Sequence, residues 1–367
     1  MAPRTLLFSQ DPGGGNLLAP AARRLADAAP GGGLLIVAHP LSEGSFSREG
    51  VPFRPLGEIF GELPVPAEKL ESWFRAEGFG RLICSLSSTH LDLTNCDLIR
   101  AARAAGAPSL GLIDHWKGAD RFFDASGAPA YCPDLIGVID ELCARNLERA
   151  GIERGRMRIA GHPALERVFR LREERTPPGA APRILLVSQP QADEGDFMSI
   201  FALPCNGRTL LEEAVDRLRE AFKPGEAAIG YRPHPKERAF GPLPAGVRLE
   251  AGPRGEDVLL RFDLFAGMSS LFLVEARLAG GACVELDIPE VEAFRQEGAM
   301  PDWAARRVGA IAELGEGARA AWAAMADSAQ SAASGDNPFS GSLERTVDLC
   351  LGFIAHGAPA ETAAPAK

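Results

Sequence analysis

The sequence predicts two doubly wound α/β domains, because short apolar segments alternate with amphipathic helical segments along most of the chain. Its 367 residues are also more than a single domain usually holds. The alternation stops at a charged, proline-rich stretch, residues 172–182, and then restarts. We therefore expect an N-terminal domain of residues 1–175 and a C-terminal domain of residues 183–335, each Rossmann-like and facing a central cleft.

The elements of the first half follow from its apolar pattern. Expected strands are residues 5–8, 34–37, 82–86, 110–113, 135–139 and 157–160, and expected helices are residues 17–28, 67–75, 92–105 and 141–149. Short apolar strands that alternate with helices predict a parallel sheet covered on both faces.

The second half repeats this pattern after the linker. Expected strands are residues 183–188, 227–231, 247–250, 262–266 and 282–286, expected helices are residues 209–222 and the segment after Ser270, and residues 291–352 are expected to be mostly helical. Residues 357–367 are rich in Ala and Pro, which predicts a disordered tail.

Composition limits the classes of function. Hydrophobic residues make up 46% and charged residues 24% of the chain, which is ordinary for a soluble globular protein. The net charge of -10 argues against nucleic acid as a partner. The seven cysteines form no CxxC pair and no zinc-spaced cluster with histidine, so we expect reduced thiols and no metal. No apolar run reaches membrane-spanning length and no signal peptide is recognisable, which predicts a cytoplasmic protein.

The sequence Tyr-Arg-Pro-His-Pro-Lys at residues 231–236 is the most informative stretch. An apolar strand precedes it, and its two prolines end that strand abruptly. Arg232, His234 and Lys236 would then lie at the carboxyl end of a strand, where cations and an imidazole suit a phosphate group. The alternative is a solvated basic turn.

A second anion site is predicted where the segment 262–276 passes from strand through a turn of small residues into a helix. Ser269 or Ser270 would cap this helix, and Glu275 falls within its first two turns. Backbone N–H groups at a capped helix N-terminus bind anions. The alternative is an ordinary capped core helix.

Gly13, Gly14, Gly15 and Asn16 follow the first strand and precede a helix. Adjacent glycines let the backbone approach a ligand closely. The spacing is not GxGxxG and no acidic residue ends the second strand, so a dinucleotide site is disfavoured. Two interpretations remain: the segment is a loop that lines the cleft and contacts substrate, or it is simply a tight strand–helix turn.

Asp114, His115 and Trp116 directly follow an expected buried strand. Either Asp114 or His115 could deprotonate an acceptor hydroxyl group, and Trp116 could stack on a sugar or seal the cleft. A turn-capping Asp114 and a core Trp116 are the structural alternatives. Ser188 lies at the start of the second domain, where loops often face the leaving group of a transfer reaction. We therefore predict that Ser188 lies near such a group.

These segments resemble bacterial transferases of the two-Rossmann-domain GT-B type with HP and SS motifs, which include sialyl-, polysialyl- and Kdo transferases and CDP-glycerol glycerophosphotransferases. His234-Pro235 matches the HP motif and Ser269-Ser270 the SS motif. The motifs cover residues 183–287, and the rest is similar in architecture. His115 stands where sialyltransferases have a glycine, which is a departure from their pattern.

The resemblance implies a metal-independent inverting glycosyltransferase that needs no cofactor. Its donor would be a nucleotide-activated sugar, CMP- or CDP-linked, with His234 at the departing phosphate, Ser269 and Ser270 binding that phosphate and Glu275 on the ribose. Its acceptor would be a saccharide or glycolipid of a bacterial surface polysaccharide or capsule, which would place the enzyme at the periphery of the inner membrane. The helix at residues 336–356 is expected to pack on the N-terminal domain.

Two alternatives stay open. The layout is also similar to that of UDP-N-acetylglucosamine 2-epimerases, although these have Ser-Gly-Gly where Met268, Ser269 and Ser270 stand. The chain could also be a binding protein of this fold that has lost its chemistry.

Overall fold

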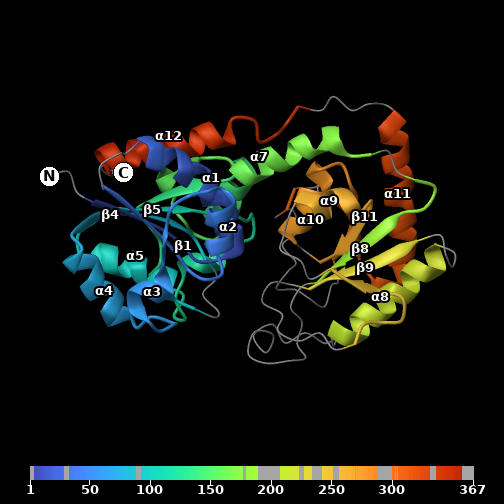
Figure 1. The fold of residues 1–367 in the computed structure, drawn as a ribbon, viewed down its shortest axis with the longest axis horizontal. Helices are drawn as coiled ribbons and strands as arrows, with labels where there is room; N and C mark the ends of the chain where they lie inside the picture. The colour runs from blue at the N-terminus through green and yellow to red at the C-terminus, as the bar shows by residue number, and fades with distance from the viewer. Residues whose placement is uncertain are drawn as a thin grey trace. The chain divides into compact units, whose positions relative to one another are not determined.

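The computed structural model describes residues 4–28, 33–87, 92–176, 179–188, 207–222, 227–233, 242–250, 256–268, 270–287, 300–301, 303, 305–330 and 336–357. Two compact units are present (Figure 1). Unit 1 comprises residues 1–166 and 338–367, and unit 2 comprises residues 167–337. The first division falls inside helix α7, Pro163–Arg170.

Unit 1 is built on a parallel seven-stranded sheet with the strand order β3-β2-β1-β4-β5-β6-β7. Its strands are β1 Arg4–Ser9, β2 Leu34–Ala38, β3 Arg54–Pro55, β4 Phe79–Ser85, β5 Ser109–Leu112, β6 Leu135–Val138 and β7 Met157–Ile159. The central strands are mostly apolar and mostly buried because helices cover both faces of the sheet.

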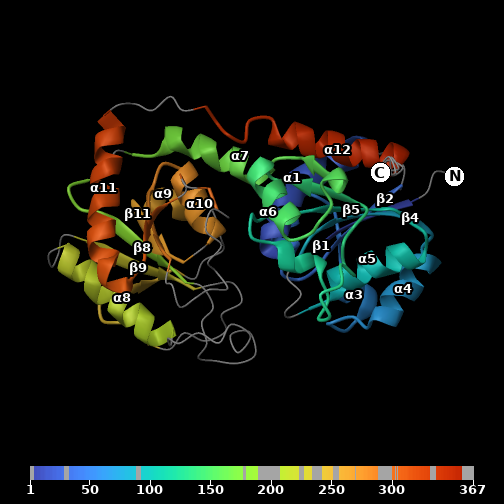
Figure 2. The ribbon, with the colours of Figure 1, turned by 180° about the vertical axis from the view of Figure 1, so that it is seen from behind.

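The helices of unit 1 lie in two layers (Figures 1 and 2). They are α1 Pro12–Ala28, α2 Glu43–Arg48, α3 Leu56–Phe60, α4 Ala67–Ala76, α5 Thr94–Ala104, α6 Glu141–Arg149 and α12 Ser342–His356. Helices α3, α4 and α5 lie on one face of the sheet, and α1 and α12 lie side by side on the other. Asp140 begins α6 by accepting a hydrogen bond from the backbone N–H of Cys143 at 2.8 Å.

The last helix, α12, completes the core of unit 1. Cys350 and Phe353 pack in the same apolar cluster as Leu17 and Leu25 of α1. The Glu166 carboxylate accepts hydrogen bonds from the backbone N–H groups of Gly341 and Leu343, at 2.8 and 3.0 Å, and so caps α12 from another segment.

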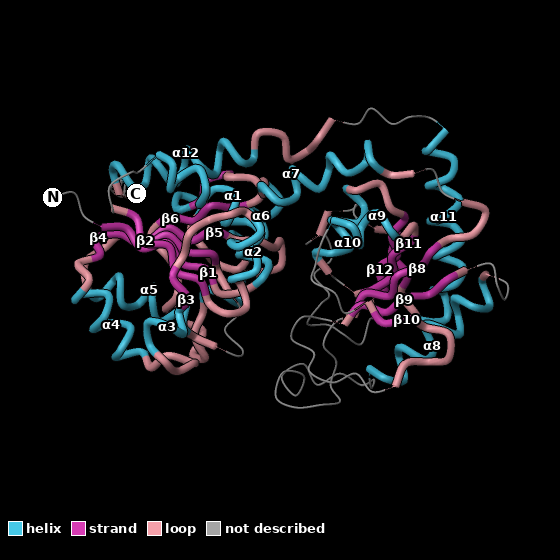
Figure 3. Tube along the Cα trace, in the orientation of Figure 1, coloured by secondary structure: helices cyan, strands magenta, loops and turns pink. Residues whose placement is uncertain are grey.

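Unit 2 is built on a parallel six-stranded sheet with the order β10-β9-β8-β11-β12-β13. Its strands are β8 Arg183–Val187, β9 Ala228–Arg232, β10 Arg248–Leu249, β11 Leu264–Gly267, β12 Ala282–Leu286 and β13 Arg306–Val308. Helices α8 Gly207–Ala221 and α11 Leu314–Gln330 pack together on one face of this sheet, and α9 Glu256–Arg261 and α10 Leu271–Leu278 lie on the other (Figure 3).

The predicted α/β class with two doubly wound sheets is confirmed, and local predictions fail mainly at short elements. Residues 291–352 were expected to be mostly helical, but β13 lies within them as an edge strand. It is only three residues long, Arg-Arg-Val, so no apolar run marks it. The edge strand β3 was missed for the same reason, as were the six-residue helices α2 and α9. No helix that the structure describes is both long and apolar enough to cross a membrane.

Candidate functional site

Asp114 lies at the carboxyl edge of the unit 1 sheet, two residues after β5, and is 6% exposed. Its carboxylate forms an ion pair with Arg121, which also donates to the backbone carbonyl of Leu86 at 2.8 Å. Burial disfavours the charged form of Asp114, but Arg121 outweighs it and holds the pKa of this carboxyl below its usual range. Asp114 is therefore an ionised carboxylate, and Arg121, which the sequence analysis did not identify, fixes its position.

His115 is a half-buried neutral imidazole next to this pair. Burial, together with the Arg121 cation, lowers the pKa of His115 to about 4. Its Nδ1 accepts a hydrogen bond from the backbone N–H of Lys117 at 3.0 Å, so the ring proton lies on Nε2. At neutral pH His115 can therefore donate a hydrogen bond from Nε2, but it is a weak base.

Trp116 is buried in the core, which is the structural alternative that the sequence left open beside stacking on a sugar or sealing the cleft. Its side chain is completely buried, its Nε1 donates to the Asp140 carboxylate at 2.9 Å, and its ring packs edge-on against Phe339. No face of the indole remains for a ligand. The sequence could not distinguish these roles, because a tryptophan after a buried strand suits both.

The glycine segment forms the first turn of α1 and is not a loop. A Cβ on Gly13 would overlap the Asp114 carboxylate, and one on Gly14 would overlap the Ser85 side chain. A Cβ on Gly15 would lie 2.9 Å from the Ser45 hydroxyl. The glycines thus let the helix approach side chains of its own unit, and their contact with a substrate stays a prediction.

Asn16 is also engaged within the chain. Its Oδ1 accepts from the Ser45 hydroxyl at 2.8 Å and from Arg48 at 2.7 Å, which ties α1 to α2. Contact between Asn16 and a substrate stays a prediction.

A second polar cluster at this edge, around Asp92, was not predicted. His39 follows β2, and its Nε2 lies 3.2 Å from the Asp92 carboxylate, while its Nδ1 accepts from the backbone N–H of Leu41. Asp92 also accepts from the backbone N–H of Thr94 at 2.8 Å. Burial would raise the pKa of Asp92, but the bonds from His39 and Thr94 together hold it below its usual range. The sequence pattern could have predicted this cluster, because both residues follow strands. Asp92 was instead interpreted as the first residue of a helix.

In unit 2, Ser188, Arg232 and Ser270 end up at the carboxyl edge of the sheet. The backbone N–H of Ser188, after β8, donates to the carbonyl of Arg232, the last residue of β9, at 2.9 Å. The Ser270 hydroxyl caps α10 by accepting from the backbone N–H of Phe272 at 3.2 Å. The Arg232 guanidinium lies over the Phe272 ring, 5.2 Å from its centroid. A cation therefore lies at a capped helix N-terminus, which suits an anion.

The other predicted residues of unit 2 are less informative. His234, Lys236 and Ser269 lie outside the described residues. Glu275 lies in α10 and is 4% exposed, so contact with a ribose stays a prediction. No group of three or more metal-binding side chains occurs in the part of the chain that the structure describes.

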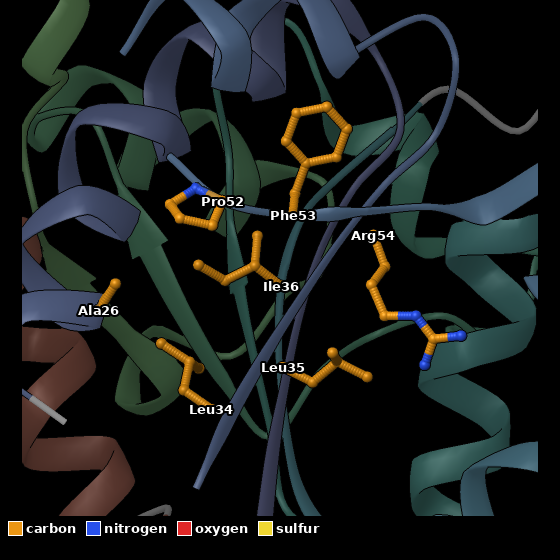
Figure 4. A pocket seen from close by; sticks show the side chains of 7 residues that line it. All are labelled: Ala26, Leu34, Leu35, Ile36, Pro52, Phe53 and Arg54. Carbon is orange, nitrogen blue, oxygen red and sulfur yellow. The ribbon is translucent and has the colours of Figure 1, made fainter. Parts of the chain in front are cut away.

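An apolar pocket of about 310 Å³ lies elsewhere in unit 1 (Figure 4). It is lined by Ala26, by residues 34–36 at the start of β2, and by residues 52–54. Strand β3 pairs only with Val37 and Ala38, at the end of β2. Residues 34–36, at the start of β2, are therefore left uncovered on that side. The pocket is at the opposite end of β2 from His39 and contains none of the predicted site residues.

No protein-family model matches the chain, and the search of curated proteins also gives no match. Solved structures do match. A putative UDP-N-acetylglucosamine 2-epimerase from Listeria monocytogenes has a TM-score of 0.64 at 12% identity, covering 96% of both chains. The UDP-GlcNAc 2-epimerase from Neisseria meningitidis bound to UDP-GlcNAc has a TM-score of 0.66 at 11% identity, covering 95% of this chain and 100% of that one. The glycosyltransferase of kitacinnamycin has a TM-score of 0.52 at 16% identity, covering 97% and 96%.

At these identities the likeness shows the fold alone. It is the GT-B-like architecture of two Rossmann-like domains, and it extends over nearly the whole length of each protein. Fold alone does not assign activity, so a reaction suggested by the fold also has to be supported by the sites.

Proposed function

We propose that the chain is a sugar-nucleotide enzyme in which unit 2 binds the nucleotide phosphates and unit 1 supplies the proton-transfer groups. The observation that carries the proposal is the placement of Arg232 over Phe272 in the first turn of α10, beside the Ser270 cap. Two segments that sequence reasoning linked separately to phosphate thus meet at one sheet edge. Charge-assisted hydrogen bonds from such a site favour a diphosphate over a neutral group.

The favoured reaction is 2-epimerisation of a UDP-sugar. Its support is the greater similarity of fold to the 2-epimerases named above than to the glycosyltransferase. Inversion at C2 removes the proton on that carbon and returns a proton to the opposite face, so it needs acid–base groups but no acceptor. Asp92 and Asp114 are both ionised carboxylates at the edge of unit 1 and could accept that proton.

Glycosyl transfer is the second candidate, because Met268, Ser269 and Ser270 match the SS segment of the transferases better than the Ser-Gly-Gly of epimerases. In that reaction Asp114 or His115 would deprotonate the acceptor and His234 would protonate the departing phosphate. His234→Ala would then lower turnover ~10²-fold or more.

One experiment separates the two reactions. The purified chain is incubated with UDP-N-acetylglucosamine in D₂O without acceptor and followed by NMR. Epimerisation predicts a manno-configured product carrying deuterium at C2. Glycosyl transfer predicts an unchanged sugar until a saccharide acceptor is added, and failure to bind any of UDP-, CDP-, CMP- and GDP-compounds would contradict both.

The proton-transfer group is then identified by substitution. Asp92→Asn and Asp114→Asn remove one carboxylate each, and loss of a general base is expected to lower turnover by about 10²–10⁴-fold while the affinity for UDP stays nearly constant. The variant that loses turnover without losing UDP affinity identifies the base. If both variants retain wild-type turnover, proton transfer does not occur at these residues.

A further inference from the structure

The apolar cavity of unit 1 exists because strand β3 is very short. This strand consists only of Arg54 and Pro55, and Pro52 precedes it by two residues. A proline has no backbone N–H to give to a neighbouring strand, so the two prolines limit the pairing of this segment with β2. The segment before β3 and residues 34–36 of β2 are not paired, and both line the cavity of about 310 Å³.

Most of the cavity wall is apolar and continuous with the core. Ala26, Leu34 and Phe53 are only partly buried, and all three pack against the core cluster of unit 1. Ile36 belongs to that cluster. An apolar group in the cavity would therefore cover side chains that are partly open to water, which is favourable.

Arg54 adds a cation to this apolar wall. It is exposed, and it makes no hydrogen bond, ion pair or ring contact with any residue that the structure describes. Figure 4 shows its side chain on one side of the cavity and Ala26 on the other, with residues 34–36 between them. A guanidinium group can donate two parallel hydrogen bonds to a carboxylate, so Arg54 is suited to one.

The size and charge of the cavity limit the class of ligand. Small-molecule sites usually measure about 300–1,000 Å³, and this cavity lies at the lower end of that range. Arg54 is the single charged residue among those that line it, which suits one negative charge. A nucleotide would leave polar and charged groups without partners against the apolar wall. An aliphatic chain that ends in a carboxylate matches both the wall and the cation.

We propose that this cavity binds an aliphatic monocarboxylate, with its chain against Ala26, Leu34 and Phe53 and its carboxylate on Arg54. The site lies at the start of β2, at the opposite end of that strand from His39 and the carboxyl edge of the sheet. It is a second site, contained within unit 1, and it does not depend on the reaction proposed above.

The test is a titration with octanoate followed by saturation-transfer NMR, which detects weak binding. Wild type is expected to give a signal from the octanoate methylene groups that reaches saturation. Arg54→Gln should weaken the affinity about 3–10-fold, because it removes a charge-assisted hydrogen bond that is open to solvent. Ala26→Leu should remove most of the signal, because the larger side chain fills the cavity.

Arg145→Gln is the matched control. Arg145 is an exposed cation of the same unit, on α6, and it is not among the residues that line the cavity. The affinity of this variant for octanoate should equal that of wild type. Octanol has a similar chain without the charge, so it should bind wild type more weakly than octanoate does, and Arg54→Gln should not change its affinity.

Two results would overturn the site itself. One is the absence of an octanoate signal in wild type, and the other is an equal signal in all three variants. Equal affinities of wild type for octanol and octanoate would refute the role of Arg54. A second copy of the chain is the alternative occupant of an uncovered strand edge. Dimers in sedimentation velocity that Ala26→Leu dissociates would therefore also overturn the proposal.

Competition with UDP separates this site from the proposed function. The octanoate signal should persist at saturating UDP, and displacement by UDP would place octanoate at the nucleotide site and refute the second site. If wild type does not bind UDP, the nucleotide assignment fails, while the variants Arg54→Gln and Ala26→Leu still decide the carboxylate site.

Discussion

The carboxyl edges of the two sheets differ in charge and in the partners that the chain supplies for their charged groups. In unit 1, carboxylates and imidazoles dominate, and the chain supplies their partners: Arg121 pairs with Asp114, and His39 pairs with Asp92. In unit 2, Arg232 lies at a helix N-terminus, and both features favour an anion. The same architecture therefore presents an acid–base edge in one unit and an anion-binding edge in the other.

Breaking the Asp114–Arg121 ion pair of unit 1 gives the largest predicted effect. Asp114→Ala leaves the Arg121 cation buried without its partner, so we expect the free energy of unfolding to fall by about 3–5 kcal/mol. Glu62→Ala is the control, since it breaks the exposed Lys69–Glu62 pair and should cost less than about 1 kcal/mol. Urea titration measures both variants, and equal losses would show that the Asp114–Arg121 pair is not a buried one.

The anion preference of unit 2 is tested by charge reversal. Arg232→Glu should weaken UDP binding by about 10²-fold, because a charge-assisted contact is replaced by repulsion. Arg261→Glu reverses an exposed cation of the same unit, on α9, and calorimetry should show little change. If both variants bind UDP like wild type, the phosphate site is not at Arg232.

The packing of α1 against the acid–base edge is tested at Gly13. Gly13→Ala would drive a methyl group into the Asp114 carboxylate, so a loss of about 1–3 kcal/mol in the free energy of unfolding is expected. Gly57→Ala, in α3, meets no atom within 4 Å and should be neutral or slightly stabilising. A Gly13→Ala protein as stable as Gly57→Ala would mean that α1 does not approach Asp114 this closely.

The last prediction concerns pH, and its effect appears only in acid. The pKa of His115 is about 4 in the folded chain against 6.5 for an ordinary histidine, so the unfolded chain binds the proton more readily. Stability is therefore lost as the pH falls from about 6.5 to 4, whereas Asp114, whose pKa is lowered, adds its loss only below about 3.8. His115→Gln should reduce the loss of stability between about pH 6.5 and 4, as measured by melting curves recorded at a series of pH values. A slope unchanged from wild type would assign that window to another group.

Apolar periodicity was sufficient to predict the sheets, because buried parallel strands must be apolar on both faces. It located β1, β5 and β12 within one or two residues. It could not reveal β13 or β3, which have few residues and no apolar run, since their pairing is decided by the neighbouring strand.

The candidate site was less predictable, because a residue's partners are not encoded near it in sequence. Position after a strand predicted that Asp114 lies at the carboxyl edge of the sheet, where the structure has it, but nothing local showed that Arg121 would pair with it or that Trp116 would be buried. His39 and Asp92 are 53 positions apart, and only the sheet order, which makes β2 and β4 the neighbours of β1, brings them together.

The capping of α12 by Glu166 has a consequence for how the protein is made. Glu166 and Gly341 are 175 residues apart, and α12 is part of the core of unit 1. At a translation rate of roughly 5–20 residues per second, about 10–35 s pass between the synthesis of these two residues. During that interval α12 is not yet available to cover α1, so we expect the apolar face of α1 to stay exposed in the nascent first unit.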